Sequence, residues 1–259
     1  MSNDTPAEKL ITRFAPSPTG LLHLGHAYSA LFAGRLATSA GGQFILRIED
    51  IDPGRCRPEF EDAIIEDMAW LGLEWPQPVW RQSERMDVYG SALETLNGMD
   101  LLYPCFCTRK DIAAEISQSG AAPHLGHDGP DGPVYPGICK SLDGSTRAAR
   151  IAAGEPHALR LDMDAAIARA GTLTWHDRSR GEQTAEPEIF GDVVLARKDV
   201  ATSYHLAVTI DDAAQGVTLV TRGSDLFAAT HIHRLLQALL DLDVPEWHHT
   251  PLLANSDGE

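Results

Sequence analysis

The stretch Arg13-Phe-Ala-Pro-Ser-Pro-Thr-Gly-Leu-Leu-His-Leu-Gly-His26 decides the predicted fold of the N-terminal half of this chain. Residues 10–15 predict a short strand, and the prolines and glycine at 16–20 predict a rigid turn after it. A helical pattern follows from His26 to about Thr38. The segment His23-Leu-Gly-His26 therefore stands where a helix begins.

The segments that follow predict strands and helices in alternation. Residues 43–48 predict a second strand, and Pro58 opens a helix on which apolar residues recur at helical spacing. This order is typical of a parallel α/β sheet. Towards the C-terminus, residues 204–210 and 217–221 predict strands, and Asp225 opens a further predicted helix. From Tyr103 to about Pro187, Gly, Pro and Asp are frequent and regular alternation is lost, which predicts an inserted subdomain.

The composition is that of a globular protein from a reducing compartment. Hydrophobic residues make up 43% of the 259 residues and charged residues 22%, which argues against a disordered chain. Four cysteines exclude a disulfide scaffold and predict a cytoplasmic location. The longest stretch without a charged side chain, 14–34, contains prolines and histidines, so no membrane span is expected, and no signal peptide is visible. The net charge of −16 argues against non-specific coating of nucleic acid.

The two histidines of the opening stretch suit a nucleotide. A helix N-terminus offers free N–H groups and the positive end of a dipole, which favours phosphate. Imidazoles of His23 and His26 can donate hydrogen bonds to phosphoryl oxygens that gain charge in a transition state. Gly25 removes a side chain where the nucleotide must come close. The alternative is that both histidines only decorate the start of a helix.

This segment resembles the HIGH-motif region of class I aminoacyl-tRNA synthetases, in their glutamyl branch. The resemblance continues through Leu46–Asp50 with Asp52 and Arg55, then Arg197–Asp212, then Thr221–Leu226. It implies ATP with Mg²⁺ as a substrate, bound by His23, Gly25 and His26, with the two histidines catalytic. It also implies a Rossmann-like catalytic domain whose halves are residues 1–102 and 191–259, with an inserted zinc-binding α/β subdomain at 103–190.

Glutamate has two carboxylates and one ammonium, so its pocket needs cations and an anion. The planar fork of arginine suits a carboxylate. The resemblance assigns Arg13 and Arg222 to this role, Glu49 to the ammonium, and the hydroxyls of Ser17 and Tyr204 to further hydrogen bonds. A solvated acidic turn is the alternative for Glu49, and a core position is the alternative for Tyr204. The glutamate-binding positions that the resemblance implies are Arg13, Phe14, Ala15, Pro16, Ser17, Glu49, Tyr204 and Arg222.

Three of the four cysteines fall in the predicted insertion, at 105, 107 and 139, and predict one structural zinc ion per chain. The resembling subfamily has the pattern C-x-C followed by Y-x3-C, which implies Cys105, Cys107, Cys139 and Tyr135 as ligands. On chemistry alone, His124 and His127 remain alternatives to Tyr135. Three ordinary thiols are the alternative to a metal site, and Cys56 is expected to be a free thiol.

Short members of the glutamyl branch lack the anticodon-binding region, and this chain resembles them in length class and in the cysteine pattern. These are the glutamyl-queuosine tRNA(Asp) synthetases. The resemblance implies a monomer that activates L-glutamate with ATP without tRNA. It then transfers glutamate to the queuosine base at the wobble position of tRNA(Asp).

Two departures from the family pattern are visible. The KMSKS-like loop, whose lysine supports the ATP phosphates, is expected to follow Ser256–Glu259, so a chain that stops there is expected to be slow or inactive. After Thr230 the family often has Pro-Arg-Gln, whereas this chain has His231-Ile-His233. The alternatives are a truncated glutamyl-tRNA synthetase that charges tRNA(Glu), a nucleotidyltransferase outside the synthetases, and a non-catalytic paralogue.

Overall fold

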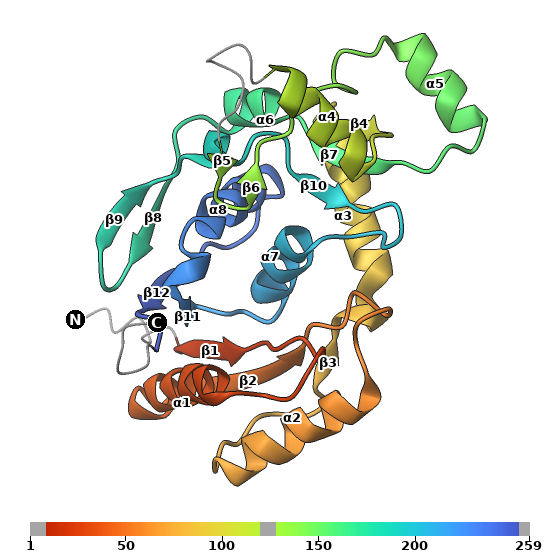
Figure 1. Cartoon of the computed structure of the whole chain (residues 1–259). Coiled ribbons are helices and arrows are strands. Elements are labelled where there is room, and N and C mark those ends of the chain that lie inside the picture. Colours follow the sequence, from red (N-terminus) through yellow and green to blue (C-terminus); the bar gives the residue numbers. More distant parts are fainter. Residues whose placement is uncertain (1–8, 120–127, 254–259) are drawn as a thin grey trace.

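The centre of the molecule is a mostly parallel sheet (Figure 1). Within residues 9–119 and 128–253, the part of the chain that the computed structural model describes, seven strands form this sheet in the order β3-β2-β1-β11-β12-β8-β9. Neighbouring strands run parallel except β8 and β9. The mainly parallel α/β fold predicted from the sequence is confirmed. In sheet order, the strands are Trp80–Arg81, Gln43–Ile48, Ile11–Phe14, Leu219–Gly223, Glu246–Thr250, Thr174–Asp177 and Gly181–Thr184.

The strand, turn and helix predicted from the opening stretch are present. Strand β1 leads through a turn into α1 (Leu24–Ser39), whose buried residues are alanines and one glycine. These small side chains let the helix approach the sheet closely, and the Thr12 hydroxyl donates a hydrogen bond to the carbonyl of Ala33 at 2.9 Å. The next predicted helix, α2 (Pro58–Trp70), begins at its proline and buries Ile64 and Met68.

The segment 204–210 is a helix, so its prediction as a strand was wrong. It begins α7 (Tyr204–Ala214), and the Ser203 side chain caps it by accepting a hydrogen bond from the N–H of Leu206. Residues 206–212 are all buried, because α7 lies inside the molecule and contacts α3 (Met86–Gly98) and α8 (Ala229–Leu239). A helix buried on every side has no apolar stripe, and periodicity cannot separate it from a buried strand.

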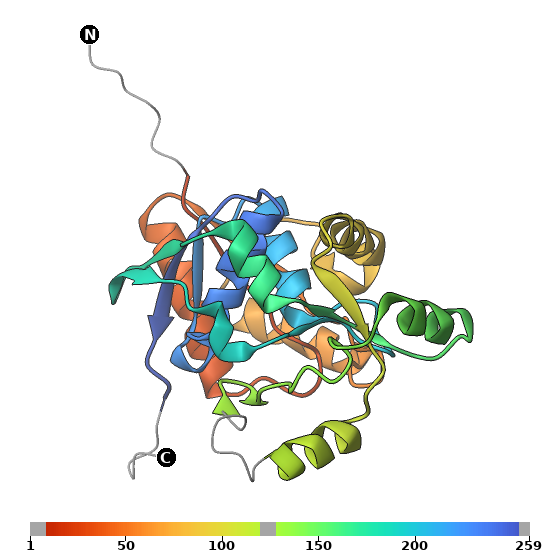
Figure 2. The ribbon, with the colours of Figure 1, turned by 90° about the horizontal axis from the view of Figure 1, so that it is seen from above.

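A second, three-stranded antiparallel sheet lies beside the main one. Its order is β10-β7-β4, and α4 and α5 project from the body near it (Figures 1 and 2). Two strands from the stretch predicted as an insertion, β8 and β9, belong to the main sheet, where Asp177 pairs with Trp247 of β12. The remaining elements are η1 (Gln82–Arg85), β4 (Leu102–Cys105), α4 (Arg109–Ser119), β5 (Asp128–Gly129), β6 (Gly132–Pro133), α5 (Gly144–Ala152), β7 (Ala158–Leu161), α6 (Met163–Ala170), η2 (Pro187–Phe190), β10 (Val194–Ala196) and η3 (Ser224–Leu226).

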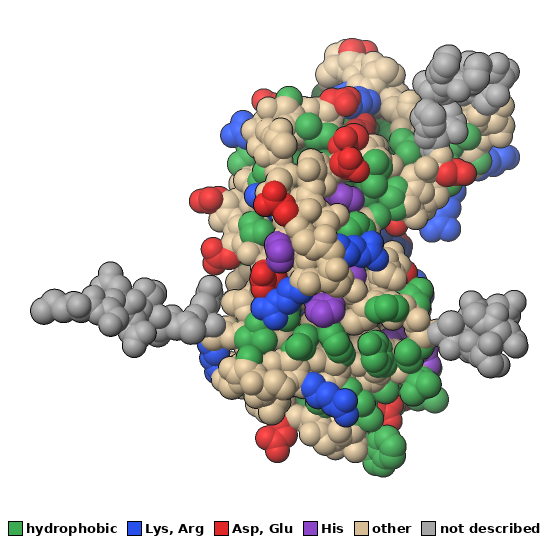
Figure 3. All heavy atoms as spheres, turned by 90° about the vertical axis from the view of Figure 1, so that its left-hand side faces the viewer, with side chains coloured by type: hydrophobic (Ala, Val, Ile, Leu, Met, Phe, Trp, Pro, Cys, Tyr) green, Lys and Arg blue, Asp and Glu red, His purple; other side chains and the backbone are tan. Residues whose placement is uncertain are grey.

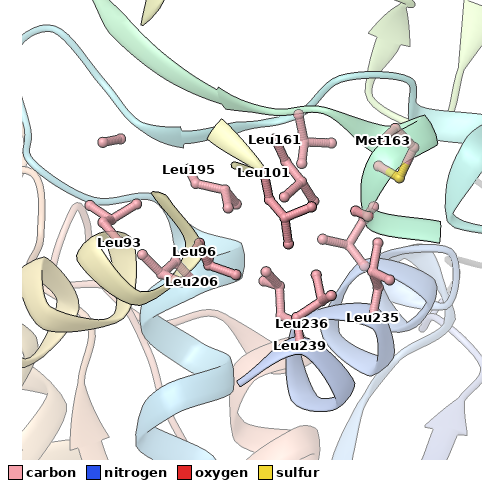
Figure 4. Close-up of a cluster of buried hydrophobic side chains, with 14 of the residues drawn as sticks. Leu93, Leu96, Leu101, Leu161, Met163, Leu195, Leu206, Leu235, Leu236 and Leu239 are labelled. Atoms are coloured by element: carbon pink, nitrogen blue, oxygen red, sulfur yellow. The ribbon is translucent and has the colours of Figure 1, made fainter. Parts of the chain in front are cut away.

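The largest hydrophobic cluster packs α3, α7 and α8 against the second sheet. Leucines from α3, β7, β10, α7 and α8 meet in it, together with Met163 at the start of α6 (Figure 4). Leu96, Leu161, Leu195 and Leu206 are fully buried there. Burial of each such side chain stabilises the fold by about 1.5–3 kcal/mol. The cluster fixes α7 and α8 against the second sheet, and these two helices supply several residues of the site described below.

The surface carries both signs of charge. On the face in Figure 3, Lys and Arg side chains are scattered among Asp and Glu. None of the helices in the described residues combines the length and the apolar character needed to cross a lipid bilayer.

Candidate active site

A cavity of about 350 Å³ opens where β1 and β11 end and α1 begins. This is the edge at which open parallel sheets bind ligands, because loops there separate above the strand ends. Pro16 and Ser17 do not line it: Pro16 accepts a backbone hydrogen bond from Glu49, and Ser17 lines an adjoining cavity of about 430 Å³ that shares Glu49 and Tyr204. Gly25 lies beside the His23 ring. The predicted site residues that line the first cavity are Arg13, Phe14, Ala15, His23, His26, Glu49, Tyr204 and Arg222.

The two histidines cap α1 reciprocally. Nδ1 of His23 accepts from the N–H of Gly25 at 3.1 Å, and Nδ1 of His26 accepts from the N–H of His23 at 3.3 Å. Their rings stack with centroids 3.8 Å apart. Burial and the neighbouring His23 lower the pKa of His26, which favours its neutral form. Since both Nδ1 atoms accept, the ring proton of each neutral imidazole is on Nε2, where it can be donated to a ligand.

Two residues that line the cavity, Arg13 and Glu49, belong to a network of buried ion pairs. Asp212 of α7 accepts from Nε of Arg13 at 3.1 Å and from Nη2 of Arg47 at 2.7 Å. Burial alone would raise the pKa of Asp212, but these two guanidinium groups hold it below its usual value. Nη2 of Arg47 also lies 3.4 Å from Oε1 of Glu49. Burial nevertheless raises the pKa of Glu49, so a second cation beside this carboxylate would stabilise its ionised form.

Arg222 is held by four neutral acceptors. Its Nε donates to Nε2 of His249 at 3.0 Å, and its Nη1 donates to the Tyr204 hydroxyl and to Nδ1 of His233, both at 3.3 Å. Nη2 donates to the Thr230 hydroxyl at 2.6 Å. Across the described residues, no carboxylate forms an ion pair with this arginine, unlike Arg13 and Arg47, and burial lowers its pKa. A buried guanidinium without a counter-ion favours an anionic ligand in the cavity.

An aspartate behind Arg222 fixes the proton of its partner. Asp177 of β8 lies 2.6 Å from Nδ1 of His249, so Nδ1 donates and Nε2 is left to accept from Arg222. Burial would raise the pKa of Asp177, but hydrogen bonds from Ser179 and His249 lower it to about 2. Burial and the charge of Arg222 lower the pKa of His249 to about 4. His249 is therefore neutral near pH 7.

We expect His249→Gln to reduce the acid sensitivity of the fold. The glutamine oxygen can replace Nε2 as acceptor for Arg222 but does not titrate. Between pH 6.5, the usual pKa of histidine, and the folded value of about 4, the unfolded chain binds a proton that the folded chain does not. The free energy of unfolding therefore falls as the pH falls through this window. Urea unfolding is expected to give the variant a slope shallower by roughly 1 kcal/mol per pH unit; equal slopes in both proteins would contradict the assignment.

The three cysteines of the predicted metal site converge. The sulfurs of Cys105, Cys107 and Cys139 lie within 4.8 Å of one another, and two of them, in Cys107 and Cys139, are 3.4 Å apart. The Tyr135 hydroxyl lies 3.4 Å from the Cys105 sulfur and 3.5 Å from the Cys107 sulfur. Tetrahedral zinc with its usual bond lengths places sulfur and oxygen about 3.5 Å apart and two sulfurs about 3.8 Å apart, so these four side chains fit the metal.

The other candidates for this site separate from the cluster. His124 and His127 fall outside the described residues. Cys56 is a free thiol that lines the second cavity and is not one of the three clustered cysteines.

Comparisons with known proteins agree with this arrangement. Residues 9–259 match the family model described as tRNA synthetases class I (E and Q), catalytic domain. This chain belongs to that synthetase family. A glutamyl-Q tRNA(Asp) synthetase of Rhodobacter capsulatus is 50% identical over 255 residues, which cover 96% of this chain and 89% of that protein. One of Symbiobacterium thermophilum is 43% identical over 258 residues, which cover 96% of this chain and 76% of that protein.

A solved structure extends the comparison to the fold. The glutamate tRNA ligase of Elizabethkingia meningosepticum, in complex with its amino acid, superimposes with a TM-score of 0.81 at 30% identity. The match covers 97% of this chain and 51% of that one, so this synthetase chain spans about half the length of that ligase. The chain is thus an ATP-dependent ligase of the class I aminoacyl-tRNA synthetase type. A nucleotidyltransferase outside the synthetases is ruled out.

Sequence reasoning missed several polar residues of this synthetase site. Arg47 and Asp212 belong to the network of buried ion pairs, and Asp177 and His249 support Arg222. Arg47 and Asp212 lie inside the two quoted family blocks, but only their spatial pairing reveals their role. His233 was singled out as a departure from the family pattern, and it contacts Arg222 directly.

Proposed function

We propose that this chain activates L-glutamate with ATP, without tRNA, and then transfers the glutamyl group to the queuosine base of tRNA(Asp). The observation that supports glutamate most strongly is that one cavity contains both a buried cation and a buried carboxylate that could each bind an opposite charge of the substrate. Arg222 is a buried cation without a carboxylate partner among the described residues, and Glu49 is a buried carboxylate whose pKa is raised. An amino acid with an anionic side chain satisfies both.

The activation step follows from the placement of the lining residues. Arg222 binds the side-chain carboxylate of glutamate, Glu49 binds the ammonium, and the α-carboxylate faces the histidines at the start of α1. An α-carboxylate oxygen attacks the α-phosphorus of ATP, the bond to the bridging oxygen breaks, and pyrophosphate leaves. His23 and His26 donate from Nε2 to phosphoryl oxygens that gain charge in this step. Mg²⁺ enters as part of the ATP substrate.

The transfer step releases AMP. A hydroxyl oxygen of the queuosine base attacks the carbonyl carbon of glutamyl-adenylate, and an ester forms. The bond between that carbon and the phosphate oxygen of AMP breaks, and the hydroxyl proton passes to solvent. Relatives that bear the glutamyl-Q tRNA(Asp) synthetase name support this acceptor, because the chain spans 73–89% of the first three of them. The reading as part of an ordinary glutamyl-tRNA synthetase is less supported, since the glutamate–tRNA ligase of Aquifex aeolicus is 36% identical to this chain, against 50% and 43% for the first two of those relatives.

A zinc ion is proposed as a structural cofactor, one per chain. Cys105, Cys107, Cys139 and Tyr135 would hold it, in a closed set that leaves no position for substrate. When bound, the metal supplies cross-links and no chemistry of the reaction. The buried cluster around it contains few residues, so the metal would contribute much of the stability of this region.

The proposed activation is tested by exchange of labelled pyrophosphate into ATP in the absence of tRNA. In the full-length protein, L-glutamate is expected to support exchange and L-glutamine is not, because glutamine leaves Arg222 without a counter-ion. L-Aspartate, whose side chain is shorter, tests the length of the pocket and is expected to support only weak exchange. Exchange with glutamine equal to that with glutamate would overturn the assignment of the cavity, and exchange that required tRNA would overturn the tRNA-independent step.

A further inference from the structure

A row of polar side chains leads from Arg222 to the surface of the inserted region. Nδ1 of His233 lies 3.3 Å from Nη1 of Arg222, and Nε2 of His233 lies 3.2 Å from Nδ1 of His205. Nε2 of His205 lies 3.5 Å from the carboxylate of Asp131, which is in the β5–β6 hairpin. We call Arg222, His233, His205 and Asp131 the histidine relay.

The ends of the relay determine where its protons are. An arginine only donates, so Nδ1 of His233 must accept and its proton is on Nε2. That proton is donated to Nδ1 of His205, whose own proton is then on Nε2, facing Asp131. An ionised carboxylate only accepts, so the proton position required by Asp131 is the same as the one required by Arg222. Every hydrogen bond of the relay therefore points from Arg222 towards Asp131.

The two rings have little freedom to leave this arrangement. His233 is 4% exposed, and the side chain of His205 is 13% exposed. Tyr204, itself a partner of Arg222, packs its ring against both histidines, with centroids 5.6 Å from His233 and 5.4 Å from His205. Phe190 of η2 also contacts His205 edge-on, with the ring centroids 6.0 Å apart.

Only the last member of the relay is exposed, and close packing sets its place. The side chain of Asp131 is 68% exposed. The hairpin that holds it lies against η2, where a Cβ on Gly129 would stand 2.6 Å from the carbonyl oxygen of Ile189. A Cβ on Gly191, whose φ is +61°, would likewise collide with the side chain of Val134. A shift of this hairpin relative to η2 moves Asp131 relative to His205.

We propose that His233 and His205 are positioning residues, through which the affinity of Arg222 for its anionic ligand depends on Asp131 of the inserted region. The proposal rests on the proposed function, in which that ligand is the side-chain carboxylate of glutamate. Each hydrogen bond of the relay fixes the orientation of the next ring. A displacement of the hairpin therefore alters the position of Arg222 without any contact between Asp131 and the substrate. The amino-acid site thereby responds to whatever displaces the hairpin.

Nitrogen-15 NMR of the histidine side chains tests the hydrogen bonds directly. The relay predicts a ring proton on Nε2 of His233 and of His205, and none on their Nδ1 atoms. His249 is the internal control, because its bond to Asp177 requires the opposite tautomer. A proton on Nδ1 of His233 or of His205 would overturn the relay. This measurement needs no substrate, so its result stands apart from that of the proposed function.

Variants in the full chain test the coupling, with the dissociation constants of L-glutamate and ATP measured by calorimetry. His233→Ala is expected to weaken glutamate binding roughly tenfold, because it removes a hydrogen bond to a charged group. His233→Asn keeps an oxygen near the position of Nδ1 and is expected to recover part of this loss, whereas His233→Gln is not. Asp131→Ala is expected to weaken glutamate binding roughly two- to fivefold.

Asp128→Ala is the matched control, since it removes the same charge from an exposed residue of the same hairpin. It is expected to leave glutamate binding unchanged, and all variants are expected to bind ATP as the wild type does. Equal effects of Asp131→Ala and Asp128→Ala, or parallel losses of ATP and glutamate binding, would overturn the coupling. Asp131 is exposed, so its replacement tests the proposal even if the His233 variants fold poorly. A wild-type chain that binds ATP but not glutamate would overturn the proposed function and the coupling with it.

Discussion

Arg222→Ala should abolish most of the affinity for L-glutamate, with a loss of about 2–5 kcal/mol. The guanidinium is buried and forms no ion pair with a carboxylate among the described residues, so the substrate would lose its main counter-ion. Arg222→Lys should not restore binding, because a lysine cannot reproduce the planar fork that serves His249, Tyr204, His233 and Thr230.

The effect of the Arg222 variants is measured by calorimetry with L-glutamate, alongside thermal unfolding. Arg35→Ala is the control, because it removes an equal charge from an exposed position on α1. Unfolding temperatures separate lost binding from lost folding, since Arg222→Ala also leaves buried acceptors without their donor. A folded Arg222→Ala variant that binds glutamate within about threefold of the wild type, well below the expected range, would remove Arg222 from the pocket.

Cys139→Ser is expected to abolish zinc binding and loosen the inserted region, with the main sheet largely intact. The three sulfurs and the Tyr135 hydroxyl leave no spare ligand among the described residues, and a serine hydroxyl does not replace a thiolate. The buried cluster around Cys139 is separate from the clusters that hold the main sheet, so loss of the metal should remain local.

Elemental analysis and limited proteolysis measure this effect. Cys56→Ser is the matched control, because it removes a thiol outside the cluster and should retain one zinc per chain. Cleavage of Cys139→Ser is expected to be faster within the inserted region and unchanged in the main sheet. Wild-type protein prepared without chelator that contained no zinc, or a Cys139→Ser variant with full zinc content, would contradict the proposed metal site.

The fold could be predicted where local signals mark each boundary. The Pro-rich turn before α1 and Pro58 at the start of α2 mark these boundaries: α2 begins at Pro58 as predicted, and α1 begins at Leu24, two residues before the predicted start at His26. The prediction failed at α7, because a helix buried on all sides has the same continuous apolar character as a buried strand. Strand β8 gave no local sign that it would pair with β12, which follows it by about 70 residues, or that β9 would extend the same sheet beyond it.

The site shows the same division between local and long-range information. The motifs named the residues that line the cavity, including Arg13, Glu49 and Arg222, and the structure brings these together. The pairing of Arg47 with Asp212 joins residues 165 positions apart, and that of Asp177 with His249 joins residues 72 positions apart. Such pairs leave no periodic or compositional trace, so their roles emerge only when the fold is known.

Transfer of labelled glutamate to purified tRNAs tests the proposed function most directly. The full-length protein is given ATP and L-glutamate with tRNA(Asp) that contains queuosine, tRNA(Asp) that lacks it, or tRNA(Glu). Label is expected only in the queuosine-containing tRNA(Asp), and it should fall steeply as salt increases, because a chain of net charge −16 must bind RNA through a local basic face. Labelling of tRNA(Glu) to the same extent would contradict the account and identify an ordinary glutamyl-tRNA synthetase activity instead.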